Sequence, residues 1–515
     1  MLNSLTSRFS VVWKMLPNKK IKRIFGFVVV TIPLGTIFLL LLINLKKPWE
    51  FDESYNLQIV QNLRSGNGYA TNGAFRGSGP YLFDPYISTG PSVLLPIWAV
   101  STIVQNTLLA SRLVMAGYFV FMLTLLYQLV PKSNFGRFTY GLMLMAILPI
   151  VKATNPLFVL GEPPAIAFFL LATVAMKRGK ISLTGVALAA VVLCKINFVM
   201  AVLVFLFFAL ISLALDHRNG AQDLLRKAMR LISSFVAPLL VFETYRFFSL
   251  GGLTAYRTNL RELRNFVDSQ RLDHWSTSAG FLGTKLTSII NIPGPLVWAA
   301  IGICSIAFSM AIVFNQNSRE FQTPENPTTL APALISGLII LGTFLFLASA
   351  PWERQAASSF YLFFPLIILL ALNRLRFLAL MSSRRIRAIG VLMTLLISIP
   401  LGLRTLSTFA DSLETIRASN FGSALDAQRD AAKIIRDSGA TSINLDGWFQ
   451  NPDYQLLSGV PAASMPNSSQ KTVMVVSATK YYFLGTYDDF LNQKNLCSEV
   501  LYSSENLLVC WPKNN

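Results

Sequence analysis

Residues 24–45 read IFGFVVVTIPLGTIFLLLLINL, and residues 49–55, which follow almost at once, read WEFDESY. The first stretch has about the 20 apolar residues that a helix needs to cross a bilayer. Similar runs recur along all 515 residues, of which 53% are hydrophobic and 13% charged, where a soluble domain carries about 25% charged residues. The sequence therefore predicts a polytopic α-helical membrane protein.

The apolar runs along the chain predict eleven membrane crossings. They are expected near 24–45, 113–130, 138–151, 163–176, 181–194, 198–215, 231–248, 293–315, 330–349, 360–372 and 388–403. No small-residue cleavage site follows the first run, so this run is interpreted as a signal anchor that remains in the protein.

The charges set the expected orientation. The chain carries a net charge of +19, and nearly all of this excess falls in segment 1–23 and in the loops that alternate with it on one side of the membrane. Basic loops stay in the cytoplasm. We therefore expect a multi-pass protein of the cell (inner) membrane with a cytoplasmic N-terminus, contacts with membrane lipids and no nucleic-acid partner.

One apolar segment does not fit this alternation. If residues 91–110 crossed the membrane, the later basic loops would lie outside, so an interfacial or re-entrant helix is predicted there. It belongs to a first exoplasmic loop, residues 46–112, of a transmembrane domain spanning 24–403.

The C-terminal region has a more polar composition. Residues 404–515 are predicted to form a small exoplasmic (periplasmic) α/β domain, with a helix near 425–435 and strands near 442–445 and 472–476. Cys497 and Cys510 flank a predicted hairpin; on an oxidising face they either form a disulfide or remain two thiols.

Acidic side chains are costly inside a bilayer, and in this chain they gather near the outer ends of the predicted helices. Asp52 and Glu53 follow the first crossing, and Glu162 precedes the fourth. Cations join them at the same level: Arg112, Lys195 and Arg354. Such a layer suits an anionic lipid-linked substrate. Plainer interpretations are a helix N-cap for Asp52, a helix start for Glu162, and headgroup anchors for the cations.

Several short motifs occur in a distinctive order along the first 200 residues. Asp52-Glu53 lies just beyond the first helix, Gly90-Pro91 opens the interfacial segment, Arg112 precedes the second crossing, Glu162-Pro163 precedes the fourth, and Lys195 ends a helix pair. This order resembles the C-type glycosyltransferase superfold, which includes the protein O-mannosyltransferases and the lipid A aminoarabinose transferases. The resemblance covers about the first 200 residues. The first-loop motif of those families is replaced by Thr89-Gly90-Pro91, with Asp84-Pro85 nearby.

The resemblance implies an inverting glycosyltransferase that takes a sugar from a polyprenyl-phosphate donor to a lipid, glycan or protein acceptor. It implies Asp52 as the general base, and Glu53 and Glu162 as residues that shape the site or hold the acceptor or a divalent metal. Lys195, Arg354 or Arg112 would contact the donor phosphate. A lipid-linked polysaccharide polymerase or ligase, a transporter and a non-catalytic assembly protein remain as alternatives.

Overall fold

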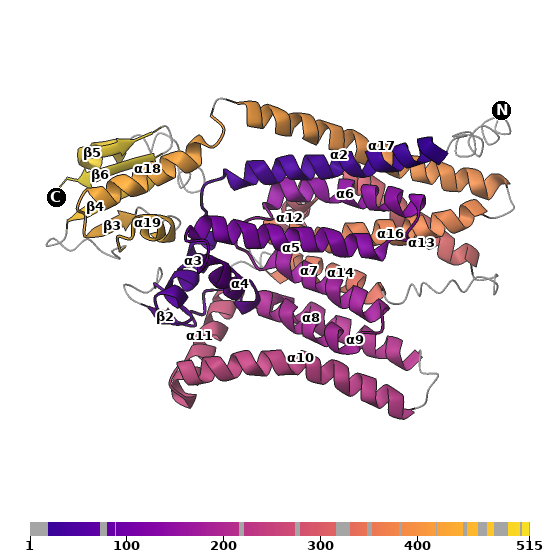
Figure 1. Ribbon diagram of the computed structural model, residues 1–515, viewed down its shortest axis with the longest axis horizontal. Coiled ribbons are helices and arrows are strands. Elements are labelled where there is room, and N and C mark those ends of the chain that lie inside the picture. Colours follow the sequence, from indigo (N-terminus) through magenta and orange to yellow (C-terminus); the bar gives the residue numbers. More distant parts are fainter. Residues whose placement is uncertain are drawn as a thin grey trace.

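A computed structural model describes residues 19–72, 80–87, 89–215, 221–272, 279–315, 330–347, 353–380, 384–418, 420–445, 451–461, 471–477, 493–504 and 507–513. Long helices run roughly parallel through most of the molecule, and a small sheet lies at one end of them (Figure 1). These helices are α2 (Lys19–Leu45), α5 (Thr107–Leu129), α6 (Asn134–Thr154), α7 (Glu162–Lys177), α8 (Ile181–Cys194), α9 (Val199–Leu215), α10 (Ala221–Ser249), α13 (Pro295–Asn315), α14 (Ala331–Leu347), α16 (Phe360–Leu380) and α17 (Arg384–Arg417).

Each predicted crossing overlaps one of these helices. Six of the described helices are long and apolar enough to cross a membrane, or seven if the pair Gly283–Asn291 and Pro295–Ile306, bent by 94°, is one span. A helix satisfies its own main-chain hydrogen bonds, which is what a chain in hydrocarbon requires. The structure is thus that of a mostly helical polytopic membrane protein, and the number eleven stays a prediction.

Several predicted boundaries are wrong by up to about four turns. Helix α5 begins at Thr107, so Arg112 lies inside this helix instead of before it. Helix α17 continues to Arg417, so the predicted domain boundary at residue 404 falls within a helix. Amphipathic ends hide such boundaries, because polar residues beyond the bilayer continue a helix without changing its backbone pattern.

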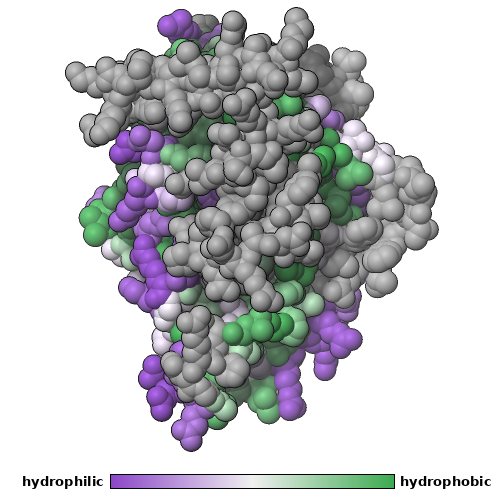
Figure 2. Space-filling model, turned by 90° about the vertical axis from the view of Figure 1, so that its right-hand side faces the viewer, coloured by the Kyte–Doolittle hydropathy of each residue, from purple (hydrophilic) through white to green (hydrophobic). Residues whose placement is uncertain are grey.

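The two ends of the bundle differ in composition. The connections from α5 to α6 and from α7 to α8, the end of α9 and the start of α10 lie at the end opposite the sheet (Figure 1). Exposed basic residues gather there, among them Lys132, Lys177 and Lys180. Figure 2 views this end, where hydrophilic side chains stand beside apolar ones. The loops predicted to be cytoplasmic therefore share one end, as far as the described residues show.

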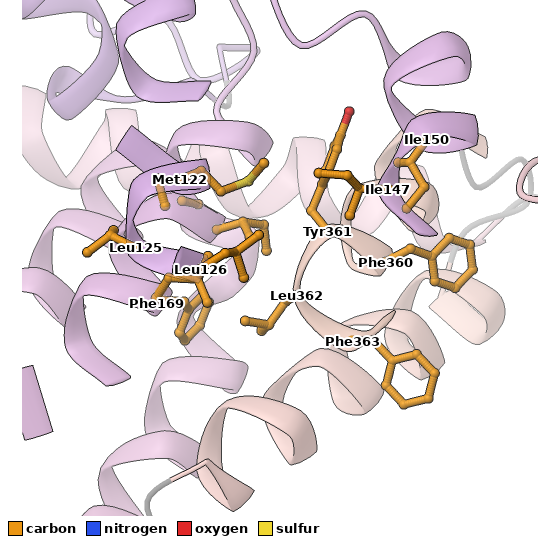
Figure 3. Packing of buried hydrophobic residues seen from close by; sticks show 14 of the residues in the cluster. Met122, Leu125, Leu126, Ile147, Ile150, Phe169, Phe360, Tyr361, Leu362 and Phe363 are labelled. Carbon is orange, nitrogen blue, oxygen red and sulfur yellow. The ribbon is translucent and has the colours of Figure 1, made fainter. Parts of the chain in front are cut away.

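The core is built around the start of α16. Phe360, Tyr361 and Leu362 are fully buried and lie among apolar side chains of α5, α6 and α7, such as Met122, Ile147 and Phe169 (Figure 3). The Tyr361 hydroxyl, which a dry core must satisfy, shares a hydrogen bond of 2.8 Å with the Thr154 hydroxyl. This core links the first half of the chain to the second.

The first outer loop folds into short elements at the sheet end of the bundle. They are α3 (Phe51–Arg64), β1 (Ala70–Thr71), β2 (Tyr81–Leu82) and α4 (Pro91–Ser101). With 11 residues, α4 is too short to cross a bilayer, in agreement with the interfacial or re-entrant helix that the charge pattern requires. Further along, α11 (Leu253–Leu272) and α12 (Ala279–Asn291) occupy the loop between α10 and α13.

The C-terminal segment forms a four-stranded sheet in the order β3-β4-β6-β5. Its strands are β3 (Ser442–Leu445), β4 (Thr472–Ser477), β5 (Cys497–Ser503) and β6 (Leu507–Pro512), and its helices are α18 (Ser423–Asp437) and α19 (Asn451–Ser458). A further short helix, α15 (Glu353–Ser358), belongs to the bundle. Strand β3 pairs with β4 in parallel, and β5 and β6 form the predicted hairpin. Cys497 and Cys510 are joined by a disulfide, with Cα atoms 5.7 Å apart.

Candidate active site

Asp52 and Glu53 lie in the first turn of α3. The helix begins at Phe51, and its N-cap is Glu50, whose side chain does not cap it. The interpretation of Asp52 as an N-cap is therefore wrong: Asp52 is a helical residue near the positive end of the helix dipole, where a carboxylate is favoured. Glu53 is buried and Asp52 is partly exposed, so the two neighbouring carboxyls have different surroundings.

Glu53 forms a buried ion pair with Arg112 of α5. Glu53 Oε2 accepts a hydrogen bond of 2.6 Å from Arg112 Nη2, and both side chains are at most 1% exposed. Arg112 Nη1 donates to the main-chain oxygen of Asn44 at 2.9 Å, and its guanidinium lies 5.0 Å from the centre of the Phe158 ring. One guanidinium thus connects the end of α2, the start of α3 and the loop before α7.

Burial dominates the titration of this carboxyl. It raises the pKa of Glu53 from an ordinary value of 4.5 to about 7, while the charge of Arg112 opposes the shift. A carboxyl in so dry a place titrates near neutral pH because the cost of desolvation exceeds the attraction of its partner.

A second buried pair lies at the start of α7. Glu162 is the first residue of that helix and is followed by Pro163 and Pro164, which suit an N-terminus because they lack the N–H that would have no partner there. Glu162 Oε1 accepts a hydrogen bond from Lys195 Nζ, and both side chains are almost fully buried. The loop 155–161 before Glu162 is buried too, which is unusual for a loop.

Main-chain contacts bring three of the motifs together. Thr89 and Lys195 form an antiparallel bridge, and Gly90 N donates to Cys194 O at 2.8 Å. A Cβ on Gly90 would lie 2.2 Å from Leu193 O, and one on Gly161 would lie 2.3 Å from Cys194 O. Glycine is thus required at both positions because the backbones approach too closely for any side chain.

A side chain that the sequence analysis did not single out connects the two ion pairs. Asn56, one helical turn after Glu53, donates to Val159 O at 2.7 Å and to Thr89 Oγ1 at 3.1 Å. Asn56 therefore connects α3 to the loop that precedes Glu162 and to Thr89, whose main chain pairs with that of Lys195. The spacing of Asp52, Glu53 and Asn56, which puts them on one side of a helix, is the signal that could have found it.

Asp84, noted in the sequence only as a neighbour of Pro85, is a buried acceptor. Its Oδ2 accepts hydrogen bonds from the Tyr55 hydroxyl and, at 2.6 Å, from the Thr71 hydroxyl, and its Oδ1 accepts from Tyr86 N at 3.0 Å. These bonds fold the first loop back onto α3.

The C-terminal segment also reaches α3. Trp49 N donates to Gln428 Oε1 at 2.9 Å, and Asp453 of α19 is buried next to Gln428. No pattern near residues 428 or 453 predicts this contact, since its partners are 379 positions apart in the case of Trp49 and Gln428.

The structure thus gathers most of the predicted site residues at the sheet end of the bundle, where α3 lies against α4 and the C-terminal helices (Figure 1). Glu53 is paired with Arg112, and Glu162 with Lys195. Arg354 belongs to α15, but its side chain lies outside the described residues. Within the described ranges, no three His, Cys, Asp or Glu side chains gather as a metal ion would need.

No protein-family model and no curated protein matches the chain. Among solved structures, ArnT from Cupriavidus metallidurans bound to undecaprenyl phosphate is similar, with 12% identity, a TM-score of 0.54, and coverage of 94% of this chain and 98% of that chain. The apo state of the same ArnT gives a TM-score of 0.57 at 12% identity and covers 95% and 98%. The oligosaccharyltransferase of Archaeoglobus fulgidus in its apo form gives 0.46 at 12% identity and covers 91% and 73%.

The two ArnT structures extend over nearly the whole of both chains. This is a likeness of fold, and it agrees with the motif order found in the first 200 residues. The chain therefore shares its fold with ArnT from Cupriavidus metallidurans.

Proposed function

We propose that this protein is a membrane glycosyltransferase that moves a sugar from a polyprenyl-phosphate donor to an acceptor, with inversion at the anomeric carbon. The observation that carries the proposal is the meeting of α3, Gly90, Glu162 and Lys195 at one end of a bundle with the C-type fold. Undecaprenyl phosphate bound to a protein of this fold supports a polyprenyl-phosphate partner.

The site lies on the outer face of the membrane in this proposal. Exposed basic residues such as Lys132, Lys177 and Lys180 lie at the opposite end of the bundle, and basic segments stay in the cytoplasm. The N-terminus is then cytoplasmic and the C-terminal sheet exoplasmic, where an oxidising compartment allows the disulfide between Cys497 and Cys510. A bacterial inner membrane is the setting that this arrangement favours.

Asp52 is the proposed general base. Its carboxylate takes the proton of the acceptor hydroxyl as that oxygen bonds to the anomeric carbon, and the bond from the anomeric carbon to the phosphate oxygen breaks at the same time. The electron pair of the broken bond stays on the lipid phosphate, which gains one negative charge. Partial exposure keeps Asp52 available for this role, whereas Glu53 is buried against Arg112.

In this mechanism, the cations stabilise the negative charge of the departing phosphate. Lys195 and Arg112 each already hold a carboxylate, so a phosphate that approaches either of them competes with, or joins, an existing pair. Arg354 at the start of α15 is the third proposed contact. Glu162 orients Lys195, since an unpaired ammonium in a dry site is costly.

Asp52→Asn tests the mechanism. It removes the proton acceptor at nearly constant size, and general-base loss costs about 10²- to 10⁴-fold in rate. The assay supplies membranes with a radiolabelled polyprenyl-phosphate sugar and measures release of the polyprenyl phosphate. To identify the acceptor, mass spectrometry compares the glycans and lipids of a deletion strain with those of the wild type and finds which product is missing.

Asp430→Asn is the matched control, because it makes the same chemical change at an exposed position of α18. We expect it to keep wild-type turnover. An Asp52→Asn variant that turns over the donor as fast as Asp430→Asn would refute Asp52 as the base. A deletion strain with unchanged glycans but altered uptake of a solute would favour the transporter alternative.

A further inference from the structure

The C-terminal segment holds the main chain just before α3. Gln428 of α18 forms two hydrogen bonds with one residue: Trp49 N donates to Gln428 Oε1 at 2.9 Å, and Gln428 Nε2 donates to Trp49 O at 3.3 Å. Both residues are buried. Trp49 directly precedes the N-cap of α3, so this amide pair fixes the point from which the helix starts.

Asp453 of α19 extends the same contact. Its Oδ2 accepts a hydrogen bond of 3.4 Å from Gln428 Nε2, and the side chain is buried. Ser54 of α3 lies beside this carboxyl and Glu53 lies close enough to interact with it electrostatically.

We propose that Gln428 and Asp453 are positioning residues for the Asp52-Glu53 turn, so that the C-terminal segment is part of the active site instead of a separate module. The proposal rests on the proposed function for its effect on catalysis, but the contact itself is independent of that function. Together, α18 and α19 determine the direction in which the first turn of α3 presents its carboxyls.

The same surroundings decide the protonation state that Asp453 needs. Burial raises its pKa well above the ordinary value of 3.8, with Glu53 and Glu50 adding to the shift and the Ser54 hydroxyl opposing it. Lys47 and Arg112 are the nearby cations, but both interact with the glutamates of this turn. Burial and the two glutamates thus favour the protonated form of Asp453, and its ionisation would place a third negative charge beside Glu50 and Glu53.

Displacement of this turn would reduce turnover. A shift of about 1 Å in a reacting group can cost about 100-fold in rate. Loss of Gln428 is therefore expected to lower kcat for sugar transfer while leaving KM for the lipid donor nearly unchanged, because the phosphate contacts proposed above come from other elements.

Hydrogen–deuterium exchange of the full chain in detergent tests the contact without any need for activity. Gln428→Ala removes the acceptor for Trp49 N, and we expect protection of that amide to fall about tenfold or more, as the loss of a buried hydrogen bond implies. Arg429→Ala, at an exposed position of the same helix, is the control and should leave the protection unchanged.

The pH dependence separates positioning by a neutral acid from simple packing. Corrected for intrinsic exchange, protection of residues 49–54 should fall as the pH rises in the wild type and in Asp430→Asn, an exposed control. In Asp453→Asn, which imitates the protonated acid, this fall should be smaller, whereas Asp453→Ala should lose protection already at pH 6.

Equal protection in Gln428→Ala and Arg429→Ala would overturn the proposal, and so would identical pH profiles in wild type and Asp453→Asn. Loss of protection at residue 49 together with no glycosyl transfer by the wild type would support the contact and refute the proposed function. The two failures are therefore distinguishable.

Discussion

Replacement of Arg112 by Met should destabilise the protein to a degree that grows with pH. The substitution keeps an unbranched side chain of similar length over Phe158, but removes the hydrogen bonds to Glu53 Oε2 and Asn44 O. At low pH Glu53 is protonated, so the cost is that of polar atoms left without partners, about 1–3 kcal/mol. At high pH the variant must also bury an unpaired carboxylate or hold a proton on it.

The sign and size of the pH effect follow from Glu53. Burial raises its pKa from 4.5 to about 7, so the folded chain holds this proton more tightly than the unfolded chain does. The resulting stability is fully present below about pH 4.5 and is lost as the pH rises through about 7. Without Arg112 the pKa of Glu53 rises further, and the loss continues above pH 7 at up to about 1.4 kcal/mol per pH unit.

Arg112→Met should therefore cost about 2 kcal/mol more at pH 8.5 than at pH 7, approaching the 3–5 kcal/mol typical of a broken buried pair. The assay is thermal unfolding in detergent at pH 5.5, 7 and 8.5, read as the difference in apparent Tm from the wild type. Adding Glu53→Gln should remove most of the pH-dependent part.

Lys152→Met is the control, since Lys152 and Asp411 form an exposed pair at 3.1 Å, and such pairs contribute at most about 1 kcal/mol. A difference in Tm between Arg112→Met and wild type that stays constant from pH 5.5 to 8.5 would show that Glu53 does not carry the effect, and the electrostatic reasoning would be wrong.

Three further predictions follow from the fold. Gly161→Ala should lower the apparent Tm strongly, because its Cβ would lie 2.3 Å from Cys194 O, while Gly117→Ala, with nothing within 4 Å, should not; equal effects would contradict the close approach. Reduction of the Cys497–Cys510 disulfide should destabilise the sheet by about 3 kcal/mol, as its loop of 13 positions implies, which limited proteolysis of the hairpin with and without reductant would detect. A thiol reagent that does not cross membranes should label Ser423→Cys from outside and Lys180→Cys only after the membrane is breached; the reverse pattern would invert the topology.

The helices and their order could be predicted from the amino-acid sequence. Hydropathy is a local property, and each predicted crossing, from 24–45 to 388–403, overlaps a helix because a chain in hydrocarbon must satisfy its main-chain polar groups within the segment itself. The distribution of Lys and Arg was likewise sufficient to require that residues 91–110 not form a full span, and α4 is short. Boundaries were less accurate, as Arg112 shows.

The types of residue at the site were also visible in the sequence, because carboxylates and cations near a bilayer are few and costly. Their partners were not. Arg112 and Glu53 are 59 positions apart, and Lys195 and Glu162 are 33 apart, so no spacing rule of a single helix or strand connects them. Residues interpreted singly as phosphate contacts or headgroup anchors are, in the structure, members of two buried ion pairs.

Tertiary structure alone decided the involvement of the C-terminal segment. Gln428 and Asp453 are ordinary polar residues of short amphipathic helices, and nothing in their neighbourhood along the chain marks them. The fold brings α18 and α19 against the start of α3, where burial excludes water. In such a dry environment, a hydrogen bond is stronger and an unpaired or ionised group is more costly than in water. The sequence by itself determined which segments form apolar helices, since that depends on the composition within each segment. The packing of distant segments determined which polar groups share one dry environment, and that property belongs to no segment alone.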